Sequence, residues 1–347
     1  MIRVGIAGIG FMGMIHYLAY RKLKGVKVAA MCEQDRTRLA GDWRSIKGNF
    51  GPAGTMMDLS GIEKYEKLDL MLANPQLDMI DICLPPAAHA PVAIAALQAG
   101  KHVFCEKPIA LKPADARWMV KAAKDAGKQL MIGQVLPFFP EYAFAYQAVK
   151  SRKYGKLLGG FFKRVISDPL WLKDFYDPEK VGGPMLDLHV HDAHYVRLLF
   201  GMPKAVFTSG RMRGRVAEYF MSQFIFDDPK LVASAMSGVI QQQGRGFCAG
   251  FEIHLERATL IYDFAVIDGK PELNMPLTVL TSDGKVQRPA MKSSDPVDAF
   301  VDELREAVRT VKTGKPSSLL DGELARDALV LCEKQTQSLA KGRLTSV

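Results

Sequence analysis

A glycine-rich turn directly after the first apolar segment is the feature that most restricts the fold. Residues Ile2 to Ala7 are apolar apart from Arg3, which predicts a short strand, and Gly8-Ile9-Gly10-Phe11-Met12-Gly13 follows where a helical pattern begins. In such a turn the first glycine permits a tight bend, the second lets the backbone approach a pyrophosphate, and the third lets the helix pack on the strand. The helix N-terminus then offers N–H groups to phosphate. The turn therefore predicts an α/β domain that binds a dinucleotide.

An acidic residue lies at the distance that such a domain requires. Glu33 follows Gly13 by 20 positions and stands at the end of the second predicted strand, where a carboxylate accepts hydrogen bonds from ribose hydroxyls. A carboxylate there also repels a 2′-phosphate, which favours NAD over NADP. Arg36 and Arg38 are close enough in sequence to neutralise such a phosphate, so NADP stays open. We expect NAD as the cofactor.

The first third of the chain alternates short apolar runs with helical patterns, which is typical of a parallel sheet covered by helices on both faces. We predict strands at 2–7, 26–32, 78–84, 102–105 and 129–133. We predict helices near 11–24, 61–73, 87–99 and 113–127.

After about residue 150 the pattern changes to longer strands that follow one another without helices, which indicates a mostly antiparallel sheet. We predict these strands at 157–166, 205–212, 218–226, 231–240, 251–256 and 259–264, and helices at 184–200, 296–313 and 321–341. The expected fold class is α/β: an N-terminal Rossmann dinucleotide-binding domain plus a C-terminal α+β domain with a large, mostly antiparallel sheet. We place the first domain at 1–125 and the substrate and oligomerisation domain at 126–320, with the helix 321–341 returning to the first.

Composition narrows the class of protein. The chain has 347 residues, 48% hydrophobic and 24% charged, which suits a packed globular protein of about two domains. No apolar run approaches the roughly 18 residues of a membrane span, and the N-terminus leaves no room for a signal peptide, so we expect a cytoplasmic protein without membrane partners. The net charge of +9 comes from scattered Lys and Arg, which argues against a nucleic-acid partner. The five cysteines form no C-x-x-C pair, so we expect buried, reduced thiols.

Four segments together resemble the Gfo/Idh/MocA family of oxidoreductases, named for glucose-fructose oxidoreductase and inositol dehydrogenase. They are Gly8 to Gly13, Asp81-Ile82-Cys83-Leu84-Pro85-Pro86-Ala87-Ala88-His89, Gly100-Lys101-His102-Val103-Phe104-Cys105-Glu106-Lys107-Pro108, and Gly182-Gly183-Pro184-Met185-Leu186-Asp187-Leu188-His189-Val190-His191-Asp192. The Glu-Lys-Pro segment is the most specific of the four. The resemblance covers nearly the whole chain and implies hydride transfer between a nicotinamide and a substrate carbon.

The resemblance also implies the catalytic residues. Lys107 corresponds to the lysine that points at the reacting carbon, where an ammonium or amine can remove a hydroxyl proton and stabilise the developing oxyanion. Asp187 and His191 correspond to a pair in which the histidine is the general acid/base and the aspartate orients it or the substrate. Their i, i+4 spacing places both on one face of a helix. With His194 the same row could instead hold a metal ion, but the dinucleotide motifs already explain the chemistry, and we expect no metal.

Other positions are assigned to cofactor or substrate. Gln134 stands three residues before Pro137, where relatives often carry arginine, and can hydrogen-bond in its place. Trp171 can stack on a sugar ring, Lys173 can contact a hydroxyl or acid group, and His194 stands where an aspartate is common. The expected cofactor-binding residues are Gly8, Gly10, Phe11, Met12, Gly13, Glu33, Arg38, Leu84, Pro85, His89, Glu106, Lys107 and Gln134.

These residues predict an NAD(P)-dependent dehydrogenase that acts on a secondary alcohol of a sugar, polyol or inositol-like compound. One alternative is a glycosidase or lyase that recycles its NAD internally, and another is a cofactor-binding regulator without turnover. The apolar run Val232 to Ile240 needs a cover, and the resemblance implies a homodimer or homotetramer formed through the C-terminal sheet.

Overall fold

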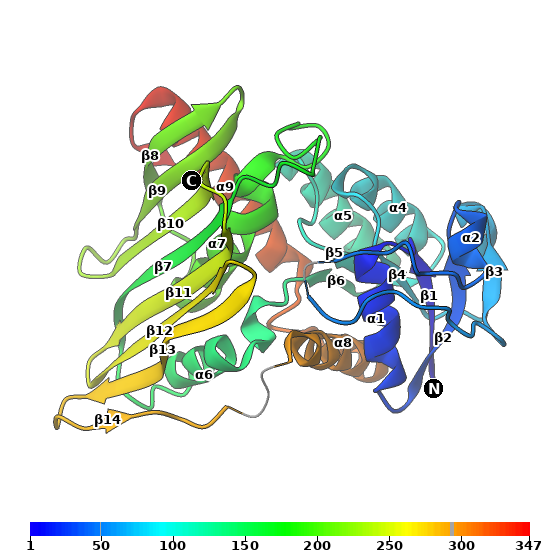
Figure 1. Cartoon of the computed structure of the whole chain (residues 1–347), viewed down its shortest axis with the longest axis horizontal. Helices are drawn as coiled ribbons and strands as arrows, with labels where there is room; N and C mark the ends of the chain where they lie inside the picture. The colour runs from blue at the N-terminus through cyan, green and yellow to red at the C-terminus, as the bar shows by residue number, and fades with distance from the viewer. Residues whose placement is uncertain (49, 292–294) are drawn as a thin grey trace. The chain divides into compact units, whose positions relative to one another are not determined.

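The computed structural model describes residues 1–48, 50–291 and 295–347. Its contacts divide the chain into two compact units, shown in Figure 1. The first unit comprises Met1–Phe138 and Ser293–Arg326, and the second comprises Phe139–Lys292 and Asp327–Val347.

The first unit is built on a six-stranded sheet with the order β3-β2-β1-β4-β5-β6. All its neighbouring strands are parallel, and the strands are β1 (Ile2–Ala7), β2 (Val26–Cys32), β3 (Glu63–Tyr65), β4 (Met79–Ile82), β5 (His102–Glu106) and β6 (Leu130–Gly133). From β1 the chain proceeds to β2 and β3 on one side, and it then returns to β4 on the other side of β1. The direction of the strand order therefore reverses between β1 and β4, which is where ligands bind in open α/β sheets.

Helices cover both faces of this sheet. They are α1 (Phe11–Arg21), α2 (Arg36–Leu39), α3 (Leu68–Leu72), α4 (Pro86–Gln98), α5 (Pro113–Ala126) and α8 (Pro296–Thr313). Right-handed crossovers that leave the centre in opposite directions place α1 and α4 on opposite faces. Helix α8 packs beside α1, and α5 packs beside α4 (Figure 1). Because helices cover both faces, β4 is buried throughout, and its sequence does not alternate between buried and exposed positions.

The second unit contains a nine-stranded sheet with the order β14-β13-β12-β11-β7-β10-β9-β8-β15. Its strands are β7 (Leu157–Ser167), β8 (Ala205–Arg213), β9 (Val216–Ile225), β10 (Val232–Ile240), β11 (Arg245–Leu255), β12 (Ala258–Ile267), β13 (Lys270–Thr281), β14 (Val286–Gln287) and β15 (Thr345–Ser346). Neighbours are antiparallel except β7 and β10, which run parallel. The expected mostly antiparallel sheet is confirmed.

One face of this sheet packs against helices and the other carries exposed apolar side chains. The helices are α6 (Pro140–Lys150), the π-helix η2 (Met185–His189), α7 (Val190–Phe200) and α9 (Gly322–Lys341). Ser209 on β8 pairs with Met221 on β9, and Met221 pairs with Met236 on β10. Side chains an even number of positions apart along a strand lie on the same face, so Phe207, Met221 and Val232 point to one face of the sheet. All three are exposed.

Several expected elements need correction. The predicted helix 61–73 is instead the strand β3 followed by the short helix α3, because Glu63–Tyr65 pairs with β2 at the sheet edge. Helix α6 and strand β13 were not expected. Strand β13 contains Pro271 and Pro276, which argue against a strand from sequence alone, and it pairs with β12 through an irregular register.

The units also differ from the expected domain boundaries. Strand β6 pairs with β5, so the first unit continues past residue 125 to Phe138. Helix α8 packs against α1 and belongs to the first unit rather than to the segment 126–320. Only the start of α9, up to Arg326, belongs to the first unit. Asp321, just before α9, pairs with Met131, whereas the Ser338 hydroxyl near the end of α9 accepts a hydrogen bond from the Thr208 N–H on β8 at 2.9 Å.

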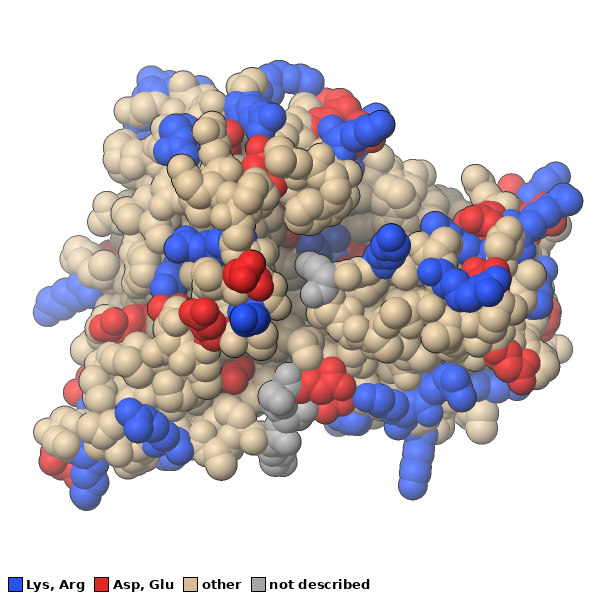
Figure 2. Space-filling view, in the orientation of Figure 1, with Lys and Arg blue, Asp and Glu red and all other residues tan. Residues whose placement is uncertain are grey.

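The distribution of charged side chains and the state of the cysteines match what the sequence predicts. On the face drawn in Figure 2, Lys and Arg side chains are spread among Asp and Glu rather than gathered in one patch. No helix in the described part of the chain is both long and apolar enough to cross a membrane. All five cysteines are free thiols, four of them buried and Cys83 partly buried.

Candidate active site

The glycine turn lies where the strand order reverses. Gly8 has a φ of +96°, and a Cβ there would lie 2.6 Å from the carbonyl oxygen of Cys83. A Cβ on Gly13 would lie 2.0 Å from the Gly8 oxygen, so only glycine lets α1 pack this close to β1. A Cβ on Gly10 would meet nothing within 4 Å, which leaves open space at the N-terminus of α1. Phe11 and Met12, the first residues of α1, are half-buried. This cradle fits the approach of a pyrophosphate.

The Glu33 carboxylate is fixed beside this turn. Its Oε2 accepts a hydrogen bond from the Ile9 N–H at 2.7 Å, and its Oε1 accepts from the N–H groups of Gln34 and Asp35 at 2.8 and 3.0 Å. Arg38 donates to the Ile9 carbonyl at 3.3 Å and lies 3.5 Å from Asp35. A negative charge therefore stands next to the turn, and the nearby arginine already has acceptors.

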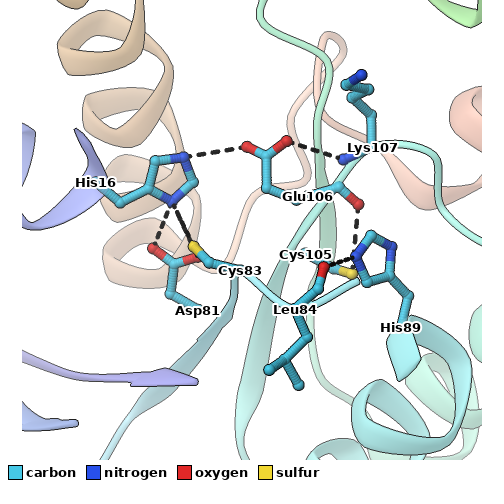
Figure 3. A network of polar contacts seen from close by, with 8 residues as sticks. All are labelled: His16, Asp81, Cys83, Leu84, His89, Cys105, Glu106 and Lys107. Atoms are coloured by element: carbon cyan, nitrogen blue, oxygen red, sulfur yellow. Dashed lines mark hydrogen bonds and ion pairs between the residues drawn. The ribbon is translucent and has the colours of Figure 1, made fainter. Parts of the chain in front are cut away.

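The Glu-Lys-Pro turn follows β5 and is tied to the loop after β4. His89 places Nε2 2.8 Å from the Leu84 carbonyl oxygen (Figure 3). Its Nδ1 lies 2.7 Å from the Pro108 carbonyl oxygen. Burial lowers the pKa of His89, and the two carbonyls act in the opposite direction. The Lys107 N–H donates to Glu106 Oε2 at 3.2 Å, and the Lys107–Pro108 peptide is cis. The ring of His89 thus joins the two turns that hold Leu84, Pro85 and Lys107.

Gln134 lies at the end of β6, beside the Glu-Lys-Pro strand. Its side chain is 1% exposed, and neither its Oε1 nor its Nε2 meets a hydrogen-bond partner among the described residues. Leaving a buried amide unpaired costs about 1–3 kcal/mol, so such a group is expected where a ligand supplies the partner. Together with Gly10 and Glu33, this amide fits a dinucleotide or its substrate.

A buried polar network, absent from our sequence expectations, lies behind the Glu-Lys-Pro turn (Figure 3). His16 on α1 has its Nδ1 3.0 Å from Asp81 Oδ2 and 3.2 Å from Cys83 Sγ, and its Nε2 3.1 Å from Glu106 Oε1. His16 and Asp81 are completely buried. Burial by itself lowers the pKa of His16, but the Asp81 carboxylate and Cys83 outweigh it and raise that pKa well above its usual value.

The expected acid/base residues belong to the second unit. Asp187 lies in the π-helix η2 and His191 in α7, and both are half-buried. A π-helical turn is wider than an α-helical one, so the i, i+4 spacing does not give the alignment of a regular helix. His194, one turn further on, is completely buried. Its side chain is thus enclosed in the chain as it stands, and its contact with substrate stays a prediction.

In the part that the structure describes, the side chains whose geometry could hold a metal ion lie in the first unit and not around Asp187 and His191. Among residues 1–48, 50–291 and 295–347, the one group of three or more His, Cys, Asp or Glu with the geometry of a metal site is His16, Asp81 and Cys83. Asp187, His191 and His194 do not form such a group.

The loop after β7 carries Trp171 and Lys173, both of which are exposed. Trp171 is 73% exposed, so it is not part of the core. Behind it, Asp168 is buried and accepts hydrogen bonds from the Tyr176 hydroxyl at 2.9 Å and from Arg213 at 2.8 Å. The loop base is thus fixed while the tryptophan stays available to a ligand or another surface.

His189 is a structural residue whose burial has a measurable consequence. Its Nδ1 lies 2.9 Å from Ser237 Oγ and its Nε2 2.8 Å from Gln335 Nε2, and burial lowers its pKa from 6.5 to about 4. The unfolded chain therefore binds a proton below pH 6.5 that the folded chain does not bind until about pH 4. We expect this residue to make folding less favourable by about 3 kcal/mol between pH 7 and pH 4, with no effect above pH 7.

Urea unfolding of wild type and His189→Asn at several pH values tests this. The variant is expected to lose less stability on acidification than wild type, whatever its stability at pH 7. His254→Asn is the control, because that ring is exposed on β11. Parallel pH dependence in wild type and His189→Asn would contradict the assignment.

Comparison with known proteins agrees with this architecture. Residues 2–134 match the family described as "Oxidoreductase family, NAD-binding Rossmann fold", and residues 142–261 match the "GFO/IDH/MocA C-terminal domain". The chain is 26% identical to "Myo-inositol 2-dehydrogenase" of Thermotoga maritima over 99% of this chain and 97% of that protein. It is 28% identical to "D-apiose dehydrogenase" of Paraburkholderia graminis over 56% of this chain and 49% of that protein.

A solved structure, "Levoglucosan dehydrogenase, complex with NADH and levoglucosan", superimposes with a TM-score of 0.80 and 20% identity, covering 100% of this chain and 99% of that one. This likeness supports the fold. The chain spans about half the length of the first two curated relatives that it matches, 56% and 49%, and nearly all of the third.

Proposed function

Because the chain belongs to the GFO/IDH/MocA family of oxidoreductases, we propose that it is an NAD-dependent dehydrogenase acting on a secondary alcohol of a sugar, polyol or inositol-like compound. The observation that carries this proposal is the position of Lys107, which follows β5 at the carboxyl edge of the sheet that also holds the glycine turn. The relatives named for myo-inositol and D-apiose support the substrate class.

In the proposed reaction, a bound nicotinamide supplies the hydride acceptor or donor. Lys107 holds the substrate oxygen and stabilises the negative charge that develops there. His191 accepts the hydroxyl proton in the direction of oxidation and returns it in reduction, and Asp187 orients His191 or the substrate. Gln134 supplies an amide that has no other partner among the described residues. Trp171 and Lys173 contact the sugar.

The side chains around Glu33 favour NAD over NADP. The Glu33 carboxylate repels a 2′-phosphate, and the arginines that could neutralise it are already engaged. Arg38 contacts Ile9 and Asp35, and Arg36 lies 3.0 Å from Glu66. We therefore propose NAD as the physiological cofactor.

A panel of sugars, polyols and inositols with NAD and with NADP tests the proposal. Reduced cofactor is followed by absorbance at 340 nm, and products are followed by mass spectrometry. Substrate-dependent formation of NADH, with NAD used at least about tenfold better than NADP, is the expected result. Product without an absorbance change would instead support a glycosidase or lyase that recycles its cofactor, and cofactor binding without turnover would support a regulator.

The exposed face of the nine-stranded sheet supports a homo-oligomer. Phe207, Met221 and Val232 share that face and are exposed in the single chain, and apolar sheet faces of this kind are covered by another surface in stable proteins. We expect a homodimer or homotetramer formed through this sheet. Light scattering at micromolar concentration checks it, and a monomeric mass would contradict it.

A further inference from the structure

We propose that His16 is a positioning residue for the Glu-Lys-Pro turn: its ring lies between Asp81 on β4 and Glu106 on β5, and Glu106 in turn holds the backbone of Lys107. The effect on turnover rests on the proposed function, since the turn matters for catalysis only if Lys107 contacts the substrate. The link itself is independent of that function.

The geometry forms a continuous path (Figure 3). Asp81 Oδ2 lies 3.0 Å from His16 Nδ1, and Glu106 Oε1 lies 3.1 Å from His16 Nε2. The second oxygen of Glu106 accepts a hydrogen bond from the Lys107 N–H at 3.2 Å. The first contact is a hydrogen bond, and the second is an ion-pair contact. A carboxyl group therefore lies at each ring nitrogen: Asp81 is hydrogen-bonded to Nδ1, and Glu106 Oε1 contacts Nε2 without hydrogen-bond geometry.

Side chains from several elements of the first unit surround His16. They are Asp81 on β4, Cys83 after β4, Phe104 and Glu106 on β5, and Phe300 on α8. A buried carboxyl group is costly unless it has a partner, so the His16 ring between Asp81 and Glu106 holds both side chains in place.

The space around Glu106 is narrow, which is independent evidence that its position is fixed. A Cβ on Gly133 would lie 2.8 Å from Glu106 Oε1 and 3.4 Å from the Phe104 ring. Gly133 is paired with Glu106 across β5 and β6. An alanine there would push the carboxylate without changing any charge, so Gly133→Ala offers a test that leaves His16 in place.

The experiment is a double-mutant cycle on His16 and Glu106. Turnover and KM are measured with the best substrate of the panel for wild type, His16→Gln, Glu106→Gln and the double variant. We expect each single variant to lower kcat about 10- to 100-fold with little change in KM, and the double variant to be no slower than the slower single one, because both act through one path. His102→Gln is the matched control, since that residue begins β5 at the end away from the turn. Losses that multiply would overturn the proposal.

A readout without substrate separates the link from the proposed function. In ¹⁵N-labelled protein the Lys107 amide resonance should move in His16→Gln and in Glu106→Gln. If a buried substitution prevents folding, Gly133→Ala must move the same amide resonance.

Each result has a distinct meaning. A moved Lys107 resonance with unchanged turnover would support the link and count against the role proposed for Lys107. A stationary resonance, or one equivalent of zinc bound by wild type but not by Cys83→Ser, would overturn the link.

Discussion

Replacing Lys107 with methionine lowers kcat by roughly 10²- to 10⁴-fold while the enzyme still binds NADH, if the side chain acts on the substrate oxygen as proposed. Methionine keeps much of the length and apolar volume of lysine but removes the charge and the proton. The expected loss is the range that positioned acid/base groups contribute. Steady-state kinetics with the best substrate of the panel gives the loss of turnover, and fluorescence titration gives the affinity for NADH.

Lys121→Met is the matched control, because Lys121 is exposed on α5 in the same unit. It should retain wild-type kinetics. Near-normal turnover of Lys107→Met would count heavily against the proposed mechanism. Loss of NADH binding together with turnover would show that Lys107 serves the cofactor rather than the reaction.

The substitutions Gly10→Ala and Gly13→Ala are expected to have different effects: the first lowers the affinity for NADH, and the second lowers the free energy of unfolding. At Gly10 the backbone has φ −90° and ψ −161°, which alanine adopts easily, and a Cβ would enter open space. We therefore expect the melting temperature to change by less than about 2 °C and the affinity for NADH to fall at least about tenfold. At Gly13 a Cβ would lie 2.0 Å from the Gly8 oxygen. The helix must then move off the strand, with an expected loss of roughly 1–3 kcal/mol in unfolding free energy.

Thermal unfolding and NADH titration of both variants check this contrast. Equal destabilisation by the two variants would mean that Gly10 is packed in solution. Unchanged NADH affinity in Gly10→Ala would mean that the cofactor does not approach the backbone there.

The parallel sheet could be predicted closely because its signals are local. The strands Ile2–Ala7 and Val26–Cys32 were predicted to the residue, as was the helix Pro296–Thr313. In each of these segments an apolar pattern is bounded by a residue that favours the beginning or the end of a strand or helix. Strand β3 could not be predicted in this way, because Glu63–Tyr65 becomes a strand only through its pairing with Ala30–Cys32.

The candidate site was predicted in part, for a related reason. The turns that carry Gly8 and Lys107 have sequence signatures, whereas the link through His16 has none that spacing reveals. A sign of it was present: Asp81 is a charged residue inside the short apolar strand β4, and a buried charge requires a partner. Which residue that partner is depends on how α1 packs across the sheet. Spacing also gave no sign that His194 is completely buried, because local pattern does not tell which side of a helix is enclosed.

The interleaving of the two units along the chain limits how this protein can be cut or recombined. The first unit takes α8 from residues that follow strands β7 to β14 of the nine-stranded sheet, and α8 contributes Phe300 and Glu303 around His16. A gene fragment ending at residue 138 would encode the glycine turn and the Glu-Lys-Pro turn but not the helix that covers α1. The chain passes between the two units three times, after residues 138, 292 and 326, so exchange of substrate domains between relatives must preserve all three junctions at once.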